Sequence, residues 1–123
     1  MKLGQHFLMD RAVIERITGY AYLQPQDCVL EIGPGTGNLT DVLADRADLV
    51  YAVEIDPDLA AQLYYRFSNV RVINGDALKI ELPRCNKIVS NLPYQISSAI
   101  TYRLLSRPFE TAVLMYQWEL AGA

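Results

Sequence analysis

Five short apolar runs are spaced along the chain, and they predict strands at residues 28–32, 49–53, 70–73, 87–90 and 111–115. In four of the runs most positions are apolar, rather than every second one, and the run at 87–90 has the apolar pair Ile88 and Val89 at its centre. Such runs are typical of parallel strands that are buried on both faces. They therefore predict a sheet in the interior of the fold.

The segments between these runs carry apolar residues at helical spacing. Asp10 and Asp56 are expected to be helix N-caps, Pro57 suits a first helical turn, and Ser97 or Ser98 is expected to cap a last helix that ends near residue 105. The apolar faces are predicted at Val13, Ile14, Ile17 and Ala21, at Leu39, Val42, Leu43 and Ala47, and at Leu59, Leu63 and Phe67. This alternation predicts an α/β fold with a doubly wound, mostly parallel sheet and right-handed crossovers.

Residues 1–123 contain no internal repeat, low-complexity tract or interdomain linker, so we expect one domain. Few residues follow the fifth predicted strand, and its outer edge would be left open. Natural sheets avoid open apolar edges. We therefore expect a fragment that is truncated after about the fifth strand, or a partner that covers the edge. A short carboxyl-terminal helix is the remaining alternative.

The composition is that of a globular domain, with 51% hydrophobic residues, 20% charged residues and a formal net charge of −3. Cys28 and Cys85 lack C-x-x-C spacing, and His6 is the one histidine. These features argue against a disulfide-stapled miniprotein, a zinc site, a dithiol redox motif and a Ser-His-Asp triad. We expect no metal. The apolar runs are too short to span a bilayer, so we expect a cytoplasmic protein without a membrane segment.

Charge is distributed unevenly along the chain. Residues 83–109 hold four bases, Arg84, Lys87, Arg103 and Arg107, and no acid. This stretch is either a solvated face or a surface near an anionic partner. A pI near 5.0 argues against a strong grip on nucleic acid by these residues alone.

A glycine-rich turn, residues 33–37, stands between the first predicted strand and the next helix. Glycine lets the backbone approach a ligand closely, and in doubly wound sheets ligands lie beyond the carboxyl ends of the strands. A dinucleotide fingerprint would need a third glycine where Asn38 stands, and a phosphate-binding P-loop would need a Gly-Lys-Ser or Gly-Lys-Thr sequence that is absent. The pattern E-x-G-x-G-x-G, which begins at Glu31, therefore favours a ligand without phosphates.

Acidic residues follow the next two predicted strands. Glu54 stands about 20 residues after the glycines, where an acid can accept both hydroxyls of a ribose. Asp76 follows the third strand, where a carboxylate could accept a hydrogen bond from an adenine amino group. Each acid alone is better explained as a helix-capping or solvated residue. Together with the glycines they predict an adenosine site.

The sequence Asn91-Leu92-Pro93-Tyr94 follows the fourth predicted strand and is the most specific signal in the chain. It is either an ordinary Asn-Pro turn with a surface tyrosine or part of the same site. Its position at a fourth strand end favours the second interpretation.

The chain resembles the ribosomal RNA adenine dimethyltransferases, which include the small-subunit enzymes and the Erm resistance methylases. The resemblance covers nearly the whole chain and rests on four motifs in order, at residues 4–10, 31–37, 74–77 and 90–94. It implies a Rossmann-like, S-adenosylmethionine-dependent methyltransferase fold with S-adenosyl-L-methionine as cofactor. It further implies that the missing part holds the last strands, a second aromatic residue for the target base and a basic helical RNA-binding domain.

The resemblance also implies roles for individual residues. Cofactor-binding residues would be His6, Leu8, Gly33, Gly35, Glu54, Ile55, Asp76, Ala77 and Asn91, and catalytic residues would be Asn91, Leu92, Pro93 and Tyr94. After residue 115 the chain departs from the family pattern, with Trp118 where a basic residue is common.

The implied activity is methylation of the exocyclic amino group of adenine, on two adjacent adenosines of a small-subunit ribosomal RNA hairpin. The implied partners are ribosomal RNA and the small ribosomal subunit. The alternatives are an Erm-type enzyme acting on large-subunit RNA, an enzyme acting on DNA adenine, and a non-catalytic ribosome-assembly or transcription factor that keeps the cofactor site. A nicotinamide oxidoreductase is a further alternative, opposed by Asn38.

Overall fold

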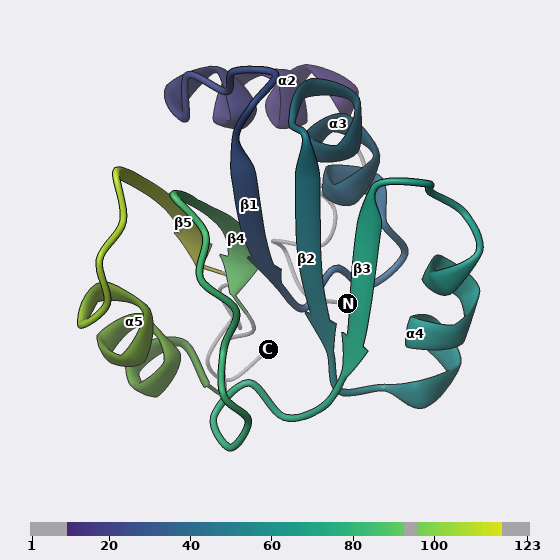
Figure 1. Ribbon diagram of the computed structural model, residues 1–123, viewed down its shortest axis with the longest axis vertical. Helices are drawn as coiled ribbons and strands as arrows, with labels where there is room; N and C mark the ends of the chain where they lie inside the picture. The colour runs from purple at the N-terminus through teal and green to yellow at the C-terminus, as the bar shows by residue number, and fades with distance from the viewer. Residues whose placement is uncertain (1–9, 93–95, 117–123) are drawn as a thin grey trace, which may run out of the picture.

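The computed structural model describes residues 10–92 and 96–116, in which five strands form one sheet with four helices packed on it (Figure 1). The strands are β1 (Cys28–Ile32), β2 (Leu49–Glu54), β3 (Val70–Asn74), β4 (Lys87–Leu92) and β5 (Thr111–Tyr116). The helices are α2 (Arg11–Tyr20), α3 (Asn38–Arg46), α4 (Pro57–Tyr64) and α5 (Ser97–Leu105). The five predicted strands are confirmed, and none of their ends moves by more than two residues.

The described strands are all parallel and lie in the order β3-β2-β1-β4-β5. The chain runs outward from β1 through β2 to β3, and then crosses to the other side of β1 to make β4 and β5. This order confirms the doubly wound α/β fold. The direction of winding reverses between β1 and β4, which is where such sheets hold their ligands.

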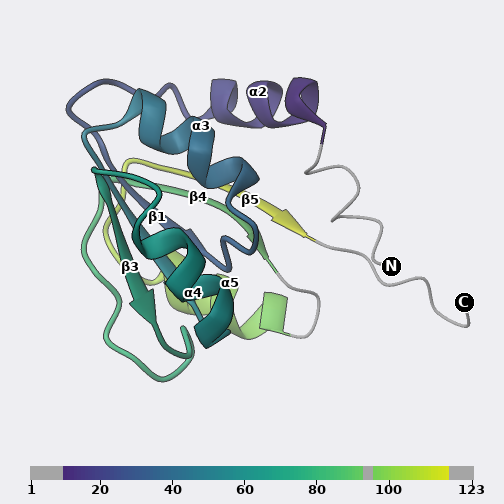
Figure 2. The ribbon, with the colours of Figure 1, turned by 90° about the vertical axis from the view of Figure 1, so that its right-hand side faces the viewer.

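Figure 2 shows α2 and α3 on one side of the sheet and α5 on the other. Alternate residues of the strands contribute to two apolar cores, one on each face of the sheet. Val29 packs with residues of α2 and α3, including Ile14 and Leu43. Leu30, the next residue of β1, points to the opposite face and packs with Ile100 of α5. Burial on both faces explains the apolar residues of the inner strands β1, β2 and β4, whereas the edge strands β3 and β5 are only partly buried.

Two of the three predicted helix starts are confirmed. The side chain of Asp10 accepts the backbone N–H of Ala12, and that of Asp56 accepts the N–H groups of Asp58 and Leu59. The prediction for α5 was wrong, because Ser97 is its first helical residue and Ile96 stands at the N-cap position without a side-chain capping bond.

The fourth strand continues through Asn91 and Leu92, so the expectation that these residues follow it was wrong. Asparagine is depleted in strands, which is why the prediction ended at residue 90. Pairing with β5 extends the strand, since Asn91 and Leu92 lie opposite Met115 and Tyr116. Asn91 is thereby fixed to the sheet instead of a loop.

The basic stretch does not form one anion-facing surface. Lys87 is buried, and its Nζ donates to the carbonyl oxygen of Ala21 and lies 3.8 Å from Oδ2 of Asp27. Burial alone would raise the pKa of the Asp27 carboxyl, but hydrogen bonds from Asn86 and Gln24, together with Lys87, hold that pKa below its ordinary value. Lys87 therefore stabilises the interior and is not available to a partner.

Two further basic residues of this stretch, Arg103 and Arg107, also have partners within the fold. Arg103 donates to the carbonyl oxygens of Ala77 and Ile80, and Arg107 donates to that of Pro83. These bonds attach α5 and the turn after it to the connection between β3 and β4.

Within residues 10–92 and 96–116, no helix combines the length and the hydropathy of a membrane span. The same residues include no group of three or more His, Cys, Asp or Glu side chains arranged to hold a metal ion.

Candidate functional site

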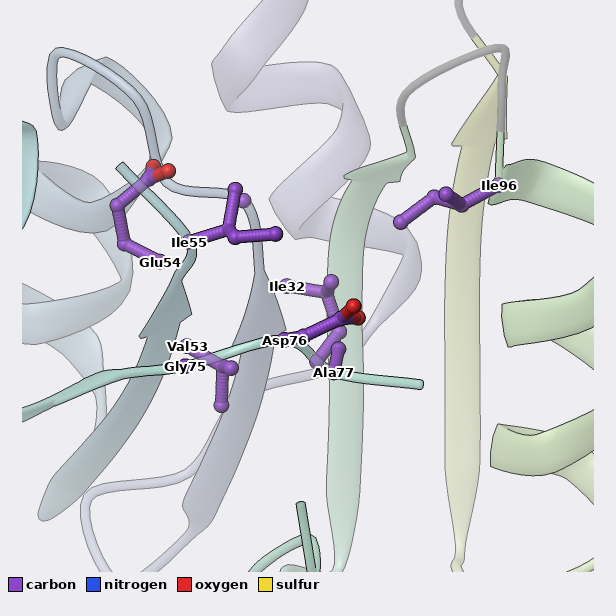
Figure 3. Close-up of a pocket in the computed structure, with 9 residues that line it drawn as sticks. Ile32, Val53, Glu54, Ile55, Gly75, Asp76, Ala77 and Ile96 are labelled. Carbon is purple, nitrogen blue, oxygen red and sulfur yellow. The ribbon is translucent and has the colours of Figure 1, made fainter. Parts of the chain in front are cut away.

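A cavity of about 270 Å³ opens at the carboxyl ends of β1, β2 and β3 (Figure 3). This volume lies near the lower end of small-molecule sites, which typically measure about 300–1,000 Å³. The residues that line it are Ile32, Gly33, Val53, Glu54, Ile55, Gly75, Asp76, Ala77 and Ile96. Its walls are mostly apolar, with two carboxylates and two glycine backbones among them, and none of these lining residues is basic.

The turn after β1 has a conformation that needs glycine. Gly33, Gly35 and Gly37 all have positive φ, at 69°, 59° and 89°. A Cβ built on Gly35 would meet nothing closer than 4.0 Å, so the backbone there faces open space. A Cβ on Gly37 would lie 2.7 Å from Cδ2 of Leu63. Gly35 thus gives a ligand access, whereas Gly37 allows α4 to pack against the start of α3.

Glu54, at the end of β2, is almost fully buried and holds this turn in place. Its Oε1 accepts the backbone N–H of Gly35 at 2.9 Å, and its Oε2 accepts that of Asp56 at 3.0 Å. A carboxylate oxygen has more than one acceptor site. Each oxygen can therefore still accept a hydrogen bond from a hydroxyl group of a ligand in the cavity.

Asp76 lies in the turn after β3, and its carboxylate is one of those seen in the cavity wall in Figure 3. Its Oδ1 accepts the backbone N–H of Leu78, and its own carbonyl oxygen accepts those of Lys79 and Ile80. Neighbouring Asn74 donates from Nδ2 to the carbonyl oxygen of Glu54 at 2.8 Å. The turns after β2 and β3 are therefore joined by hydrogen bonds below the cavity.

Glu31, the first residue of the glycine pattern, is a buried acid behind the turn, with an exposed fraction of 2%. The Thr40 hydroxyl donates to its Oε1 at 2.6 Å. Burial raises the pKa of the Glu31 carboxyl to about 8, a rise that the Thr40 hydrogen bond opposes and the nearby Glu54 carboxylate reinforces. At neutral pH this carboxyl therefore carries a proton.

β1 and β4 separate at their carboxyl ends, and a side chain bridges them. Their ladder pairs Leu30 with Ile88, and two residues further on the Ser90 hydroxyl accepts the backbone N–H of Ile32 at 2.9 Å and donates to its carbonyl oxygen at 2.7 Å. The side chain of Ser90 thus replaces the backbone hydrogen bonds that would otherwise join β1 and β4 at this position. The reversal point of the sheet is therefore open beside Gly33 and Asn91.

Asn91 follows Ser90 and carries a buried polar atom without a partner. Its residue is 5% exposed, and its Oδ1 makes no hydrogen bond in the part of the chain that the structure describes. An unpaired buried acceptor costs about 1–3 kcal/mol. Such an atom near the carboxyl end of a strand points to a ligand that brings a donor to it.

The cavity brings together five of the predicted cofactor-binding residues: Gly33, Glu54, Ile55, Asp76 and Ala77. Gly35 is hydrogen-bonded to Glu54, and Asn91 follows Ser90, whose hydroxyl bonds to Ile32 where the winding of the sheet reverses. The side chain of Leu92 is in the apolar core, so only its backbone is available for the predicted role. His6, Leu8, Pro93 and Tyr94 lie outside the described residues, as does Trp118.

Four lining residues were not predicted: Ile32, Val53, Gly75 and Ile96. Ile32 and Val53 end their strands, so the rule that ligands lie at carboxyl strand ends could have identified them. Ile96 has no such signal. It reaches the cavity from the side opposite β2 and β3, as Figure 3 shows.

The geometry suits a flat, largely apolar group that carries hydroxyl and amino donors. Apolar walls can enclose an aromatic ring, and the two carboxylates accept hydrogen bonds at opposite parts of the cavity. Without basic residues among those that line it, the cavity offers little to a phosphate.

The family model described as ribosomal RNA adenine dimethylase matches residues 1–122. Two curated relatives, both named probable ribosomal RNA small subunit methyltransferase A, are similar along nearly the whole chain. The one from Methanosarcina mazei is 55% identical over 120 residues, and the one from Thermococcus onnurineus is 58% identical over 121 residues. The matches cover 95% and 97% of this chain but 44% of each relative, so the chain spans less than half of their length.

Solved structures of related enzymes are similar in fold. A dimethyladenosine transferase from Plasmodium falciparum is 37% identical with a TM-score of 0.79, covering 91% of this chain and 43% of that one. The 23S rRNA methyltransferase ErmE is 43% identical with a TM-score of 0.80, covering 94% of this chain and 49% of that one.

Proposed function

This chain belongs to the ribosomal RNA adenine dimethylase family, and we propose that it is the cofactor-binding and catalytic part of an enzyme that methylates adenine in ribosomal RNA. The observation that carries the proposal is the unpartnered Oδ1 of Asn91, buried at the end of β4 next to Ser90, which is hydrogen-bonded to Ile32 in the wall of a cavity suited to adenosine. The names of the relatives indicate ribosomal RNA as the substrate class. The cavity and the free acceptor of Asn91 support a site for the cofactor and for the target base.

The cavity fits the nucleoside half of S-adenosylmethionine. Glu54 would accept the ribose hydroxyls on carboxylate lone pairs that remain free, and Asp76 would accept the adenine amino group. Ile32, Val53 and Ala77 provide apolar contacts for the ring. The open space over Gly35 would admit the methionine part, and we assign His6 and Leu8 to the same pocket on family resemblance.

Asn91 is proposed to hold the target adenine. Its Oδ1 would accept an N–H of the exocyclic amino group, and the carbonyl oxygen of Leu92 would accept the other. The nitrogen lone pair is delocalised into the ring, so the amino group is a poor nucleophile. Two acceptors favour a pyramidal nitrogen and stabilise the positive charge that develops on it.

Positioning supplies much of the remaining rate. S-adenosylmethionine, when bound, provides the methyl group from its sulfonium. Tyr94 is proposed to stack on the target base, which is worth roughly 1–3 kcal/mol, and Pro93 to stiffen the segment that carries it. Stacking would keep the amino nitrogen in line with the methyl carbon and the sulfur. An adenine in an RNA loop leaves its stack at lower cost than one in a duplex.

We assign the activity to the small ribosomal subunit, with dimethylation of two adjacent adenosines and a cytoplasmic location beside the ribosome. The structures do not favour one subunit, because the dimethyladenosine transferase and ErmE are similar to this chain to nearly the same degree. The curated relatives favour the small subunit, since they are 55% and 58% identical and carry that name.

The test is mass spectrometry of nucleosides from RNA that has been incubated with the full-length protein and S-adenosylmethionine. Undermodified small subunits and naked large-subunit RNA are treated in parallel. We expect N6,N6-dimethyladenosine in the small-subunit RNA alone. Methylation confined to large-subunit RNA would overturn the subunit assignment. Cofactor binding without methylation of either RNA would indicate a non-catalytic factor and overturn the proposal.

A further inference from the structure

The two cysteines of the chain meet in the fold although they are far apart in the sequence. The Sγ atoms of Cys28 and Cys85 lie 2.9 Å apart, and the residues are 57 positions apart. Ordinary non-bonded contacts between carbon atoms measure about 3.5–4.0 Å, and a disulfide bond measures about 2.05 Å. The distance between the two sulfur atoms therefore lies between that of a disulfide bond and that of an ordinary non-bonded contact.

The backbone on both sides of the pair is held in register by polar contacts. Asn86, which follows Cys85, accepts the backbone N–H of Cys28 on its Oδ1 at 2.8 Å and donates from Nδ2 to Oδ1 of Asp27 at 2.8 Å. Lys87 adds the buried ion pair with Asp27. The start of β1 and the segment that enters β4 are thus fixed side by side, with each cysteine next to an anchored residue.

Both cysteines are half-buried and free in the structure. Partial exposure lets a small reagent reach the sulfur atoms, while the anchored backbone keeps them together after one of them has reacted. Access and proximity are two requirements for closing an intramolecular crosslink by exchange, and a thiolate as the attacking group is the third.

We propose that Cys28 and Cys85 are a site of covalent modification, at which a low-molecular-weight disulfide oxidises them to an intramolecular disulfide. The thiolate of one cysteine attacks a sulfur of the reagent, which forms a mixed disulfide and releases one small thiolate. The second cysteine, as thiolate, then attacks the protein sulfur of that mixed disulfide and displaces the other small thiolate. In sum, two protein thiols lose two electrons and two protons, and one small disulfide becomes two small thiols.

The crosslink would join the start of β1 to the connection between β3 and β4, at the opposite end of the sheet from the cavity. Burial, together with contact with Cys28, raises the pKa of the Cys85 thiol, although nearby Arg107 acts in the opposite sense. The reduced pair therefore gains little stabilisation as a thiolate. In some oxidoreductases the reduced form is stabilised, which makes their disulfide easy to reduce. The disulfide between Cys28 and Cys85 lacks this effect and should therefore be harder to reduce.

The experiment treats the purified, fully reduced protein with oxidised glutathione and stops the reaction with acid. Proteolysis at acidic pH followed by mass spectrometry locates the crosslink. We expect one peptide pair joined through Cys28 and Cys85, two hydrogens lighter than its separate parts. We also expect the Tm of the oxidised protein to rise by roughly 5–10 °C, since the crosslink restricts the unfolded chain.

The variants Cys28→Ser and Cys85→Ser are the controls, because each retains a single member of the pair. Each should accept glutathione as a stable adduct and show no rise in Tm on oxidation. Glutathione adducts on both cysteines of the unsubstituted protein, or two thiols that stay free in the folded protein, would overturn the proposal. So would a crosslink that forms only between molecules.

Discussion

Glu54 fixes the turn that follows a neighbouring strand, because its Oε1 accepts the backbone N–H of Gly35 at 2.9 Å. The residue expected to hold the ribose is therefore also the residue that shapes the glycine turn. Binding and local structure cannot be separated at this position.

We predict that Glu54→Gln weakens binding of S-adenosylmethionine about 10- to 100-fold. The amide has one acceptor oxygen, so it can serve only one of the backbone N–H groups of Gly35 and Asp56, and it lacks the charge that strengthens bonds to hydroxyls. Isothermal titration measures the change. Glu81→Gln, which alters an exposed acid outside the cavity, is the matched control. Equal affinity in both variants would remove Glu54 from the site.

Asn91→Ala should abolish most methyl transfer while leaving the protein folded and able to bind cofactor. We expect turnover to fall by about 10²–10³, as for loss of one transition-state hydrogen bond, and the cofactor affinity to stay within about tenfold, or 1.4 kcal/mol. A tritium-transfer assay beside titration separates the two effects.

The stability of the same variant is a second test. Oδ1 of Asn91 has no partner within the described residues, so removing this side chain breaks no hydrogen bond of that oxygen. The Tm of Asn91→Ala should therefore be close to that of the unsubstituted protein. Wild-type turnover in this variant would show that Asn91 does not take part in methyl transfer, and a large fall in Tm would show that it has a structural role.

Glu31→Gln should change how stability depends on pH. In the folded protein burial holds the pKa of Glu31 at about 8, above its ordinary value near 4.5, so the folded state keeps a proton that the unfolded state releases. Stability therefore falls as pH rises from about 4.5 to 8, by up to roughly 1 kcal/mol per pH unit from this residue, and levels off above that range.

The glutamine variant keeps an acceptor for the Thr40 hydroxyl and lacks the titration. Urea unfolding between pH 5 and pH 8.5 measures the free energy of unfolding of both proteins. As pH rises, that of the variant should increase relative to that of the unsubstituted protein. Parallel curves would mean that Glu31 is charged in the folded state.

Two glycines should respond oppositely to alanine. At Gly37, φ is 89° and a new Cβ would lie 2.7 Å from Leu63 and 2.8 Å from Arg66, so Gly37→Ala should cost about 1–3 kcal/mol. Gly19 lies in α2 with nothing within 4 Å of a Cβ, so Gly19→Ala should add about 0.5–1 kcal/mol. Urea unfolding measures both. Equal effects would show that the turn can relax around the added methyl group.

The strands and the glycine turn could be predicted because their signals are local. An apolar run marks a buried strand, and the rule that ligands lie at carboxyl strand ends then places Gly33, Glu54 and Asp76 together. The end of β4 could not be predicted, because Asn91 is kept in the strand by pairing with Met115 in β5.

Other features depend on residues that are distant in sequence. Lys87 looks like a surface charge until Asp27 is placed beside it, and Cys28 and Cys85 look isolated until the register of β1 and β4 brings them together. The roles of His6, Leu8, Pro93 and Tyr94 stay predictions.

The bridge between Ser90 and Ile32 bears on how the protein matures during synthesis. It joins positions 58 residues apart and completes the central strand on its second side. A ribosome must therefore release the chain beyond residue 92 before β1 can acquire its later neighbour. Until then the nascent chain has the glycine turn and most of the residues that line the cavity, but it lacks Ile96 and the buried acceptor of Asn91, so the site is incomplete.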